Sequence, residues 1–386
     1  MSDQAPKILK LVILMTGTLW GIVLSSCSEK ADPQSESLSS NLGVFDLSTN
    51  TFEVCKSKKS GKETFLSFFS KGGYSVPGNP GVDTLTKFFE EIRAGYFQET
   101  DDLNYSIIKR EYHTFTHAMD VMIATHSLLQ NGAAVFLKPE ERSVLLLAAL
   151  GHDALHTGVN NGFLTNAKHS LIEEFGEQGV QEKRSAQYLH ELLNTHGILQ
   201  KPEFKRYAKF IRESILWTDF SKHKELMNKI DAITPKIVKI LERERQSRGL
   251  THLGGSSPID LKEGMDLSGE IDAEERLLLA SFLLHCADVS NPGKEWPIAE
   301  KWANLVMNEF FAQGDLEKSL GMEPSMNCDR LTVKVPQCQI GFAKYVVHDL
   351  YSKLAKIVPQ GGEFLLTNLA INQAKWQSIL DSQKNP

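Results

Sequence analysis

Three short segments of this chain carry histidine and aspartate at spacings that suit metal coordination. They are YHTFTHAMDV at residues 112–121, HDALHTG at 152–158 and HCADVSNP at 285–292. Imidazole and carboxylate groups together suit a metal centre that acts on a phosphate. An isolated HxxxH on a helix is more often structural than metal-binding, and an isolated HD pair carries almost no information. The prediction of a two-metal phosphohydrolase centre therefore rests on all three segments together.

The spacing within the segments suggests how the ligands would meet. His113 and His117 are four residues apart, so on a helix both side chains would lie on one face. The adjacent His152 and Asp153 would bind side by side, with the carboxylate bridging two metals, and Asp288 would complete the first site from across the fold. A histidine-rich first site suits Zn²⁺. A second site built from one bridging carboxylate and water suits Mg²⁺ or Mn²⁺, so we expect two divalent metal ions.

Helices that are apolar on nearly every face are predicted directly before two of these segments, over residues 144–150 and 277–284. Such helices belong in the centre of a large α-helical core and would deliver the His and Asp that follow them to one point. Because strand alternation is scarce, we expect an all-α fold, a compact multi-helix single catalytic domain. Further helices are predicted over residues 82–92, 185–193 and 210–218. The glycine-rich residues 249–269 are expected to form a mobile loop or lid.

Composition narrows the class of protein. The chain has 386 residues, of which 41% are hydrophobic and 23% charged, as in an ordinary globular protein. The net charge of −6 argues against a nucleic-acid partner bound through a broad basic surface. The five cysteines are too few for a disulfide framework in a chain of this length. The oligomeric state has no signature in the sequence, so it is left open.

The first 28 residues (1–28) are predicted to be a signal peptide or a membrane or lipid anchor. Residues 11–28 are uncharged and follow two lysines, a pattern shared by secretory signals and by the shortest membrane-spanning helices. The run ending at Cys27, LSSC, also resembles the lipobox of bacterial lipoproteins, whereas an ordinary cleaved leader and a buried segment are the remaining alternatives. We expect membrane association, with the lysines favouring a catalytic part outside the cytoplasm.

The rest of the chain is predicted to form three parts. A flexible linker would occupy residues 29–41, the catalytic domain residues 42–376 and a polar tail residues 377–386.

Five motifs occur in an order and at separations that resemble one known family. They are YHTFTHAMDV, HDALHTGVNNGF, ILWTDFSKH, HCADVSNPGKEW and CQIGF, and the likeness covers roughly residues 42–375. On these motifs the chain resembles the catalytic domain of the class I 3′,5′-cyclic nucleotide phosphodiesterases, which belong among the HD-type hydrolases. The resemblance implies hydrolysis of cyclic nucleotides to nucleoside 5′-monophosphates, in which a hydroxide bridging two metals attacks phosphorus in line.

The resemblance also implies roles for individual positions. His113 matches the general acid that protonates the departing 3′ oxygen, and Glu309 matches the carboxylate that orients it. The first-metal ligands match His117, His152, Asp153 and Asp288, of which Asp153 also reaches the second metal. Residues that hold metal-bound waters or the phosphate match His156, Asn161, Glu182 and Thr218.

Six positions match substrate-binding residues of the family: Tyr112, Asn291, Val306, Phe310, Gln339 and Phe342. The amide of Gln339 can donate to and accept from a purine edge, and Phe342 would clamp the ring against Val306. Asn291 could accept from the adenine amino group, which favours cyclic AMP. Ala299, where a larger polar residue often supports the pocket, leaves room for cyclic GMP or for both.

The sequence departs from the family's usual residues at several places near these motifs. Thr114 replaces an asparagine, Leu155 stands where an acidic residue is common, and Thr157 stands where proline is common. After Glu182 the chain reads Lys-Arg-Ser where paired histidines are often found. None of these changes removes a metal ligand.

Two alternative functions stay open: an HD-superfamily phosphohydrolase acting on another nucleotide, and a cyclic-nucleotide-binding module without catalysis.

Overall fold

The computed structural model describes residues 46–70, 73–97, 108–247 and 265–383, and in these residues all regular structure is helical. The predicted all-α fold is therefore confirmed. The predicted N-terminal anchor and linker, residues 1–41, lie outside the described residues, as does most of the glycine-rich segment 249–269. Within the described ranges no helix is long and apolar enough to span a membrane.

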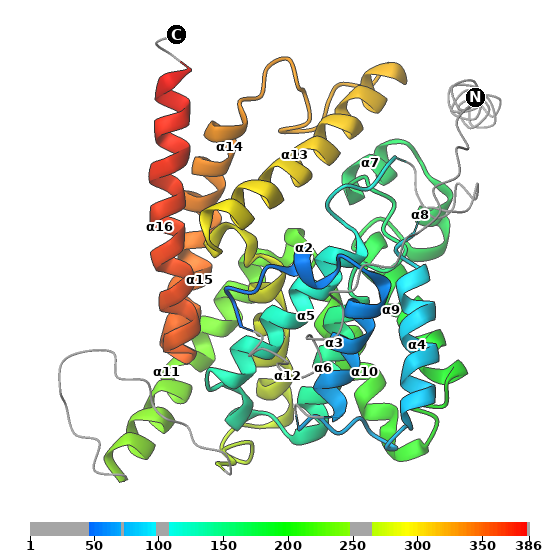
Figure 1. Cartoon of the computed structure of the whole chain (residues 1–386), viewed down its shortest axis with the longest axis vertical. Helices are drawn as coiled ribbons and strands as arrows, with labels where there is room; N and C mark the ends of the chain where they lie inside the picture. The colour runs from blue at the N-terminus through cyan, green and yellow to red at the C-terminus, as the bar shows by residue number, and fades with distance from the viewer. Residues whose placement is uncertain (1–45, 71–72, 98–107, 248–264, 384–386) are drawn as a thin grey trace, which may run out of the picture.

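Three neighbouring helices form the centre of the molecule: α5 (Phe115–Gln130), α6 (Pro139–Gly151) and α12 (Ala273–Asp288) (Figure 1). In α6 every residue from Ser143 to Gly151 is buried, which explains why its sequence has no polar face. Proline at the first position begins this helix, and α12 begins with a capping box between Asp272 and Glu275. Both helices were predicted from their apolar runs, and both end at the candidate metal ligands.

The other helices surround this centre and one another. Those on the N-terminal side and flanking α6 are α2 (Thr51–Val54), α3 (Lys58–Ser70), α4 (Val82–Ala94), α7 (Asn161–Asn166), α8 (Ser170–Phe175), α9 (Val180–Thr195) and α10 (Lys205–Leu216). Those of the C-terminal half are α11 (His223–Ser247), α13 (Trp296–Ser319), α14 (Val335–Phe342), α15 (His348–Ile357) and α16 (Pro359–Ser382). The helices predicted over 82–92, 185–193 and 210–218 correspond to α4, α9 and α10.

The C-terminal helices build a second layer beside the centre. Helices α13, α14 and α16 contact one another along one side of the molecule (Figure 1). Between α14 and α15 the chain makes one π-helical turn, Ala343–Val347, which the sequence did not predict. Helix α16 continues to Ser382 and so extends into the segment predicted as a polar tail.

Candidate active site

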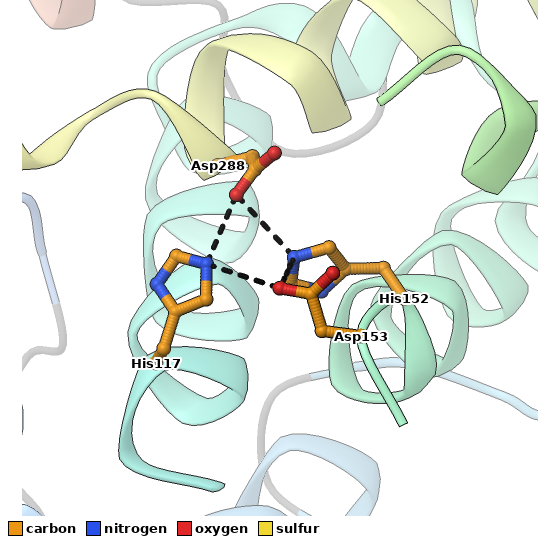
Figure 2. A group of neighbouring side chains, drawn as sticks. All are labelled: His117, His152, Asp153 and Asp288. Carbon is orange, nitrogen blue, oxygen red and sulfur yellow. Dashed lines mark hydrogen bonds and ion pairs between the residues drawn. The ribbon is translucent and has the colours of Figure 1, made fainter. Parts of the chain in front are cut away.

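Four predicted metal ligands meet at one point between the three central helices (Figure 2). One ligand atom from each residue lies within 4.8 Å of those of the other three. His117 Nε2, from the first turns of α5, is 3.0 Å from Asp288 Oδ1 at the end of α12. His152 Nε2, at the C-cap of α6, is 3.1 Å from Asp153 Oδ2. Residues far apart in the sequence thus form one cluster, as the three motifs predicted.

The orientation of His152 fits a metal ligand. Its Nδ1 lies 2.8 Å from the carbonyl of Ala149, and because a carbonyl only accepts, Nδ1 carries the proton. In the neutral imidazole, the form that binds metal, the lone pair is therefore on Nε2, which is buried and has no hydrogen-bond partner among the described residues. A backbone carbonyl that fixes the tautomer in this way is common behind metal-binding histidines.

The charges of the cluster also suit a cation. Burial alone would raise the pKa of Asp288, but His152 and His117 beside it hold that pKa well below its usual value. Burial alone would also raise the pKa of Asp153, but the neighbouring His152 lowers that pKa well below its usual value. Two buried imidazoles and two partly buried, ionised carboxylates are the donor set expected of a site for divalent metal.

His113 does not lie on the helix that carries His117, so the prediction that the two share a helical face is wrong. Helix α5 begins at Phe115, and Thr114 before it is extended, with φ −115° and ψ 171°. The reason is Glu309, because its Oε2 accepts the backbone N–H groups of Glu111, Tyr112 and His113 at 3.0, 2.9 and 3.3 Å. These bonds turn three successive N–H groups of residues 111–113 toward one carboxylate oxygen, which bends the segment and keeps it out of the helix.

His113 instead pairs with Glu309, through a short contact between Nδ1 and Oε1. Burial alone would lower the pKa of His113, but the Glu309 carboxylate raises it to about 9. Burial would raise the pKa of Glu309, and His113 lowers it to about 2. The ring of His156 stacks on His113 with centroids 3.8 Å apart, and burial followed by His113 lowers its pKa to about 3. The site therefore presents a protonated His113 beside a neutral His156.

A cavity of about 1030 Å³ opens beside this pair and the metal cluster. His117 and His152 do not line it. All other predicted site residues do, namely Tyr112, His113, Asp153, His156, Asn161, Glu182, Thr218, Asp288, Asn291, Val306, Glu309, Phe310, Gln339 and Phe342. Val306 and Phe310 come from α13, and Gln339 and Phe342 come from α14, the helix that packs beside it. The structure thus brings the predicted metal and base-binding residues to one cavity.

A further acidic residue, Glu182, lines the same cavity. Asn161 Nδ2 donates to Glu182 Oε2 at 3.0 Å. Burial and then the nearby Asp219 raise the pKa of Glu182 to about 7. Asp219 was not predicted as a site residue, although it follows Thr218 in the motif ILWTDFSKH. Its Oδ2 is buried and has no hydrogen-bond partner in the described ranges.

A buried ion pair behind the cavity fixes Asn291. Lys294 and Asp120, both fully buried, form a 2.5 Å contact, and Thr51 Oγ1 donates to the same carboxylate oxygen. The other oxygen of Asp120 accepts from Asn291 Nδ2 at 2.8 Å, and Tyr112 Oη donates to Asn291 Oδ1. A carboxylate can only accept, so the amide of Asn291 has a single orientation. Asp120 lies in the motif YHTFTHAMDV and Lys294 in HCADVSNPGKEW, but the sequence did not predict that the two form a pair.

The comparison with known families decides the relationship. The family described as 3′5′-cyclic nucleotide phosphodiesterase matches residues 112–369, which include every predicted site residue. The chain belongs to this family. The resemblance found on the five motifs is thereby confirmed.

Curated relatives of this phosphodiesterase-family chain include enzymes of Drosophila melanogaster. The 3′,5′-cyclic-AMP phosphodiesterase isoform F is 31% identical over 282 residues, which cover 71% of this chain and 39% of the relative. Isoforms N/G are 31% identical over the same length, which is 26% of that relative. The chain thus spans less than half the length of these relatives.

Solved structures show the same fold. The phosphodiesterase domain of the RhoPDE fusion protein from the choanoflagellate Salpingoeca rosetta matches with a TM-score of 0.71 and 23% identity, over 89% of this chain and 97% of that one. LmjPDEB1 in complex with IBMX matches with a TM-score of 0.72 and 23% identity, over 90% and 96%.

Proposed function

We propose that this protein hydrolyses 3′,5′-cyclic nucleotides to nucleoside 5′-monophosphates and prefers cyclic AMP. The observation that carries the proposal is the meeting, at one cavity of about 1030 Å³, of a metal-ligand cluster and the His113–Glu309 pair. Membership of the family and the names of the curated relatives support the same reaction.

Two divalent metal ions would complete the site, with Zn²⁺ proposed for the first position and Mg²⁺ or Mn²⁺ for the second. The first would be held by His117, His152, Asp153 and Asp288. When bound, such ions supply Lewis-acid activation of the phosphate and of the attacking water. His156, Asn161, Glu182 and Thr218 line the cavity around the cluster and would orient water and phosphate by hydrogen bonds.

His113 would act as the general acid. Its Nδ1 is bonded to Glu309, so Nε2 is the nitrogen that would give a proton to the departing 3′ oxygen. The carboxylate also accepts three backbone N–H groups, so it fixes both the position and the charge of the imidazole. Glu309 would therefore position the acid without touching the substrate.

The preference for cyclic AMP rests on the fixed amide of Asn291. One of its N–H groups is taken by Asp120 and one lone pair of Oδ1 by Tyr112, so the side chain cannot turn over to suit another base. Asn291 lines the cavity together with Gln339 and Phe342. We propose that its Oδ1 accepts from the adenine amino group, while Gln339 binds the purine edge and Phe342 stacks on the ring against Val306.

The test is turnover by the purified protein with Mg²⁺ or Mn²⁺, following cyclic AMP and cyclic GMP separately. Asp288→Ala, which removes a metal ligand, is the blank. We expect hydrolysis of cyclic AMP at the higher kcat/KM, and no hydrolysis in the blank. In Asn291→Ala the ratio of the two kcat/KM values should fall by about 5- to 100-fold, the size of one polar contact to a substrate.

Other outcomes would favour the alternatives. Metal binding without turnover of either nucleotide would overturn the proposed reaction in favour of a binding module. Release of phosphate from a different nucleotide would favour a general HD-type phosphohydrolase. An unchanged ratio in Asn291→Ala would leave hydrolysis standing and remove the proposed basis of the cyclic AMP preference.

A further inference from the structure

The loop between α6 and α7, residues 152–160, is held from outside by side chains of α9. The carbonyl of Ala154 accepts a hydrogen bond from Ser185 Oγ at 2.7 Å, and the carbonyl of Leu155 accepts one from Arg184 Nη1 at 2.9 Å. Both donors are almost completely buried. Backbone carbonyls that would otherwise be buried without a partner are thus satisfied by two successive residues of one helix.

Gln181, one turn earlier on α9, binds the second half of the same loop. Its Nε2 donates to Thr157 Oγ1 and to the carbonyl of Val159, each at 2.7 Å. Its Oε1 accepts the N–H of Thr157 at 3.4 Å. Gln181, Arg184 and Ser185 together are called the α9 clamp below. The clamp therefore forms hydrogen bonds with four residues of the loop, Ala154, Leu155, Thr157 and Val159.

The loop needs such support because of its conformation. Leu155 has φ +63°, in the left-handed region that a leucine rarely adopts. Its N–H donates to the carbonyl of Gly95 at 3.0 Å, and its own carbonyl is bound by Arg184, so both sides of the strained residue are fixed. Without these bonds the residue would relax toward a negative φ and redirect the chain.

The residues on either side of Leu155 belong to the active site. Asp153, two residues before it, has its Oδ2 within 3.5 Å of the Nε2 atoms of both His117 and His152. His156, directly after it, stacks on His113. Any change of φ at Leu155 would therefore change the position of a metal ligand, Asp153, relative to the partner of the general acid, His156.

We propose that the α9 clamp is a set of positioning residues that holds Leu155 in its left-handed conformation and thereby sets the metal affinity of the site. The inference rests on the proposed function, because it assumes a metal at Asp153. Leu155 and Thr157 of the loop and Arg184 and Ser185 of α9 lie in one hydrogen-bond network. The bonds therefore act together in holding the loop.

The test compares the full chain with Arg184→Ala and measures the dissociation constant for Mn²⁺ by calorimetry. Loss of a group that orients a metal ligand typically weakens metal binding by about 10- to 100-fold, and we expect an effect of this size. The KM for cyclic AMP at saturating Mn²⁺ should stay within about twofold, since no base-binding residue touches the clamp. Lys183→Ala is the matched control, because Lys183 donates to the carbonyl of Phe175 instead of to the loop.

A suppressor separates positioning from general loss of structure. In Arg184→Ala, the further change Leu155→Gly should restore most of the Mn²⁺ affinity, because glycine adopts φ +63° without strain. If Arg184→Ala does not fold, Ser185→Ala, which removes a single hydroxyl, takes its place. Wild-type Mn²⁺ affinity in a folded clamp variant, or no recovery with Leu155→Gly, would overturn the proposal. Failure of the unmodified protein to bind Mn²⁺ or to hydrolyse a cyclic nucleotide would instead overturn the proposed function as well.

Discussion

At the scale of single residues, the charge of His113 should control how the rate depends on pH. Burial alone would lower the pKa of His113, and Glu309 raises it to about 9, so the imidazole is protonated at neutral pH. A general acid must hold its proton to act, so kcat should fall as the pH rises through about 9. Glu309→Gln removes the carboxylate that raises the pKa. The alkaline limb should then move to lower pH, and kcat at alkaline pH should fall by at least about tenfold.

The measurement is the pH profile of kcat for cyclic AMP in the two proteins. Glu323→Gln, at an exposed position outside the cavity, is a control for the loss of one carboxylate and should keep the original profile. An alkaline limb at the same pH in Glu309→Gln would contradict the role given to the pair.

The same residues show what could be predicted from the sequence. The metal cluster could be predicted from the sequence, because the five motifs together fix which residue type stands at each ligand position. The place of His113 was not predictable from its spacing to His117. It depends on Glu309, which is 196 residues away. The ion pair between Asp120 and Lys294, which orients Asn291, likewise joins positions 174 residues apart that no local pattern relates.

At the scale of elements, the apolar runs predicted the central helices well. A helix in the centre of the core is buried on every face, and its sequence is therefore apolar on every face. The π-helical turn Ala343–Val347 had no such signal. This turn contains one more residue than an α-helical turn would. It lies between α14, which carries Gln339 and Phe342, and α15 in the core. The turn therefore sets the rotation of the base-binding residues relative to the rest of the fold.

Deletion of Tyr345 from this turn tests its role. Tyr345 is 76% exposed, so its loss removes little packing, but the shorter turn would become α-helical and rotate Gln339 and Phe342 relative to α15. We expect kcat/KM for cyclic AMP to fall about 10- to 100-fold, because a misplacement near 1 Å can cost that much, while Mn²⁺ affinity stays unchanged. Tyr345→Ala keeps the residue count and is the matched control, with the original kcat/KM. Equal effects of the deletion and the substitution would contradict the idea that the turn sets the rotation of α14 relative to α15.

At the scale of the whole molecule, the metal cluster joins the helices that form the core, because its ligands come from the start of α5 and from the ends of α6 and α12. The unfolded chain cannot bring these residues together, so metal should bind the folded state far more tightly. At a free metal concentration 100 times Kd the gain in the free energy of unfolding would be about 2.7 kcal/mol.

This stabilisation should depend on pH in one direction. Burial lowers the pKa of His152, but Asp153 and Asp288 override it and raise that pKa well above its usual value, so protons compete with metal at this nitrogen. Raising the pH removes the competing proton. The increase in Tm caused by Mn²⁺, measured by calorimetric melting, should therefore grow from mildly acidic to mildly alkaline pH. Asp288→Ala should show almost no increase at any pH. An increase in Tm that is independent of pH, or that survives in Asp288→Ala, would mean that the stabilising metal binds elsewhere on the protein. Metal binding at the cluster would then not be what stabilises the fold.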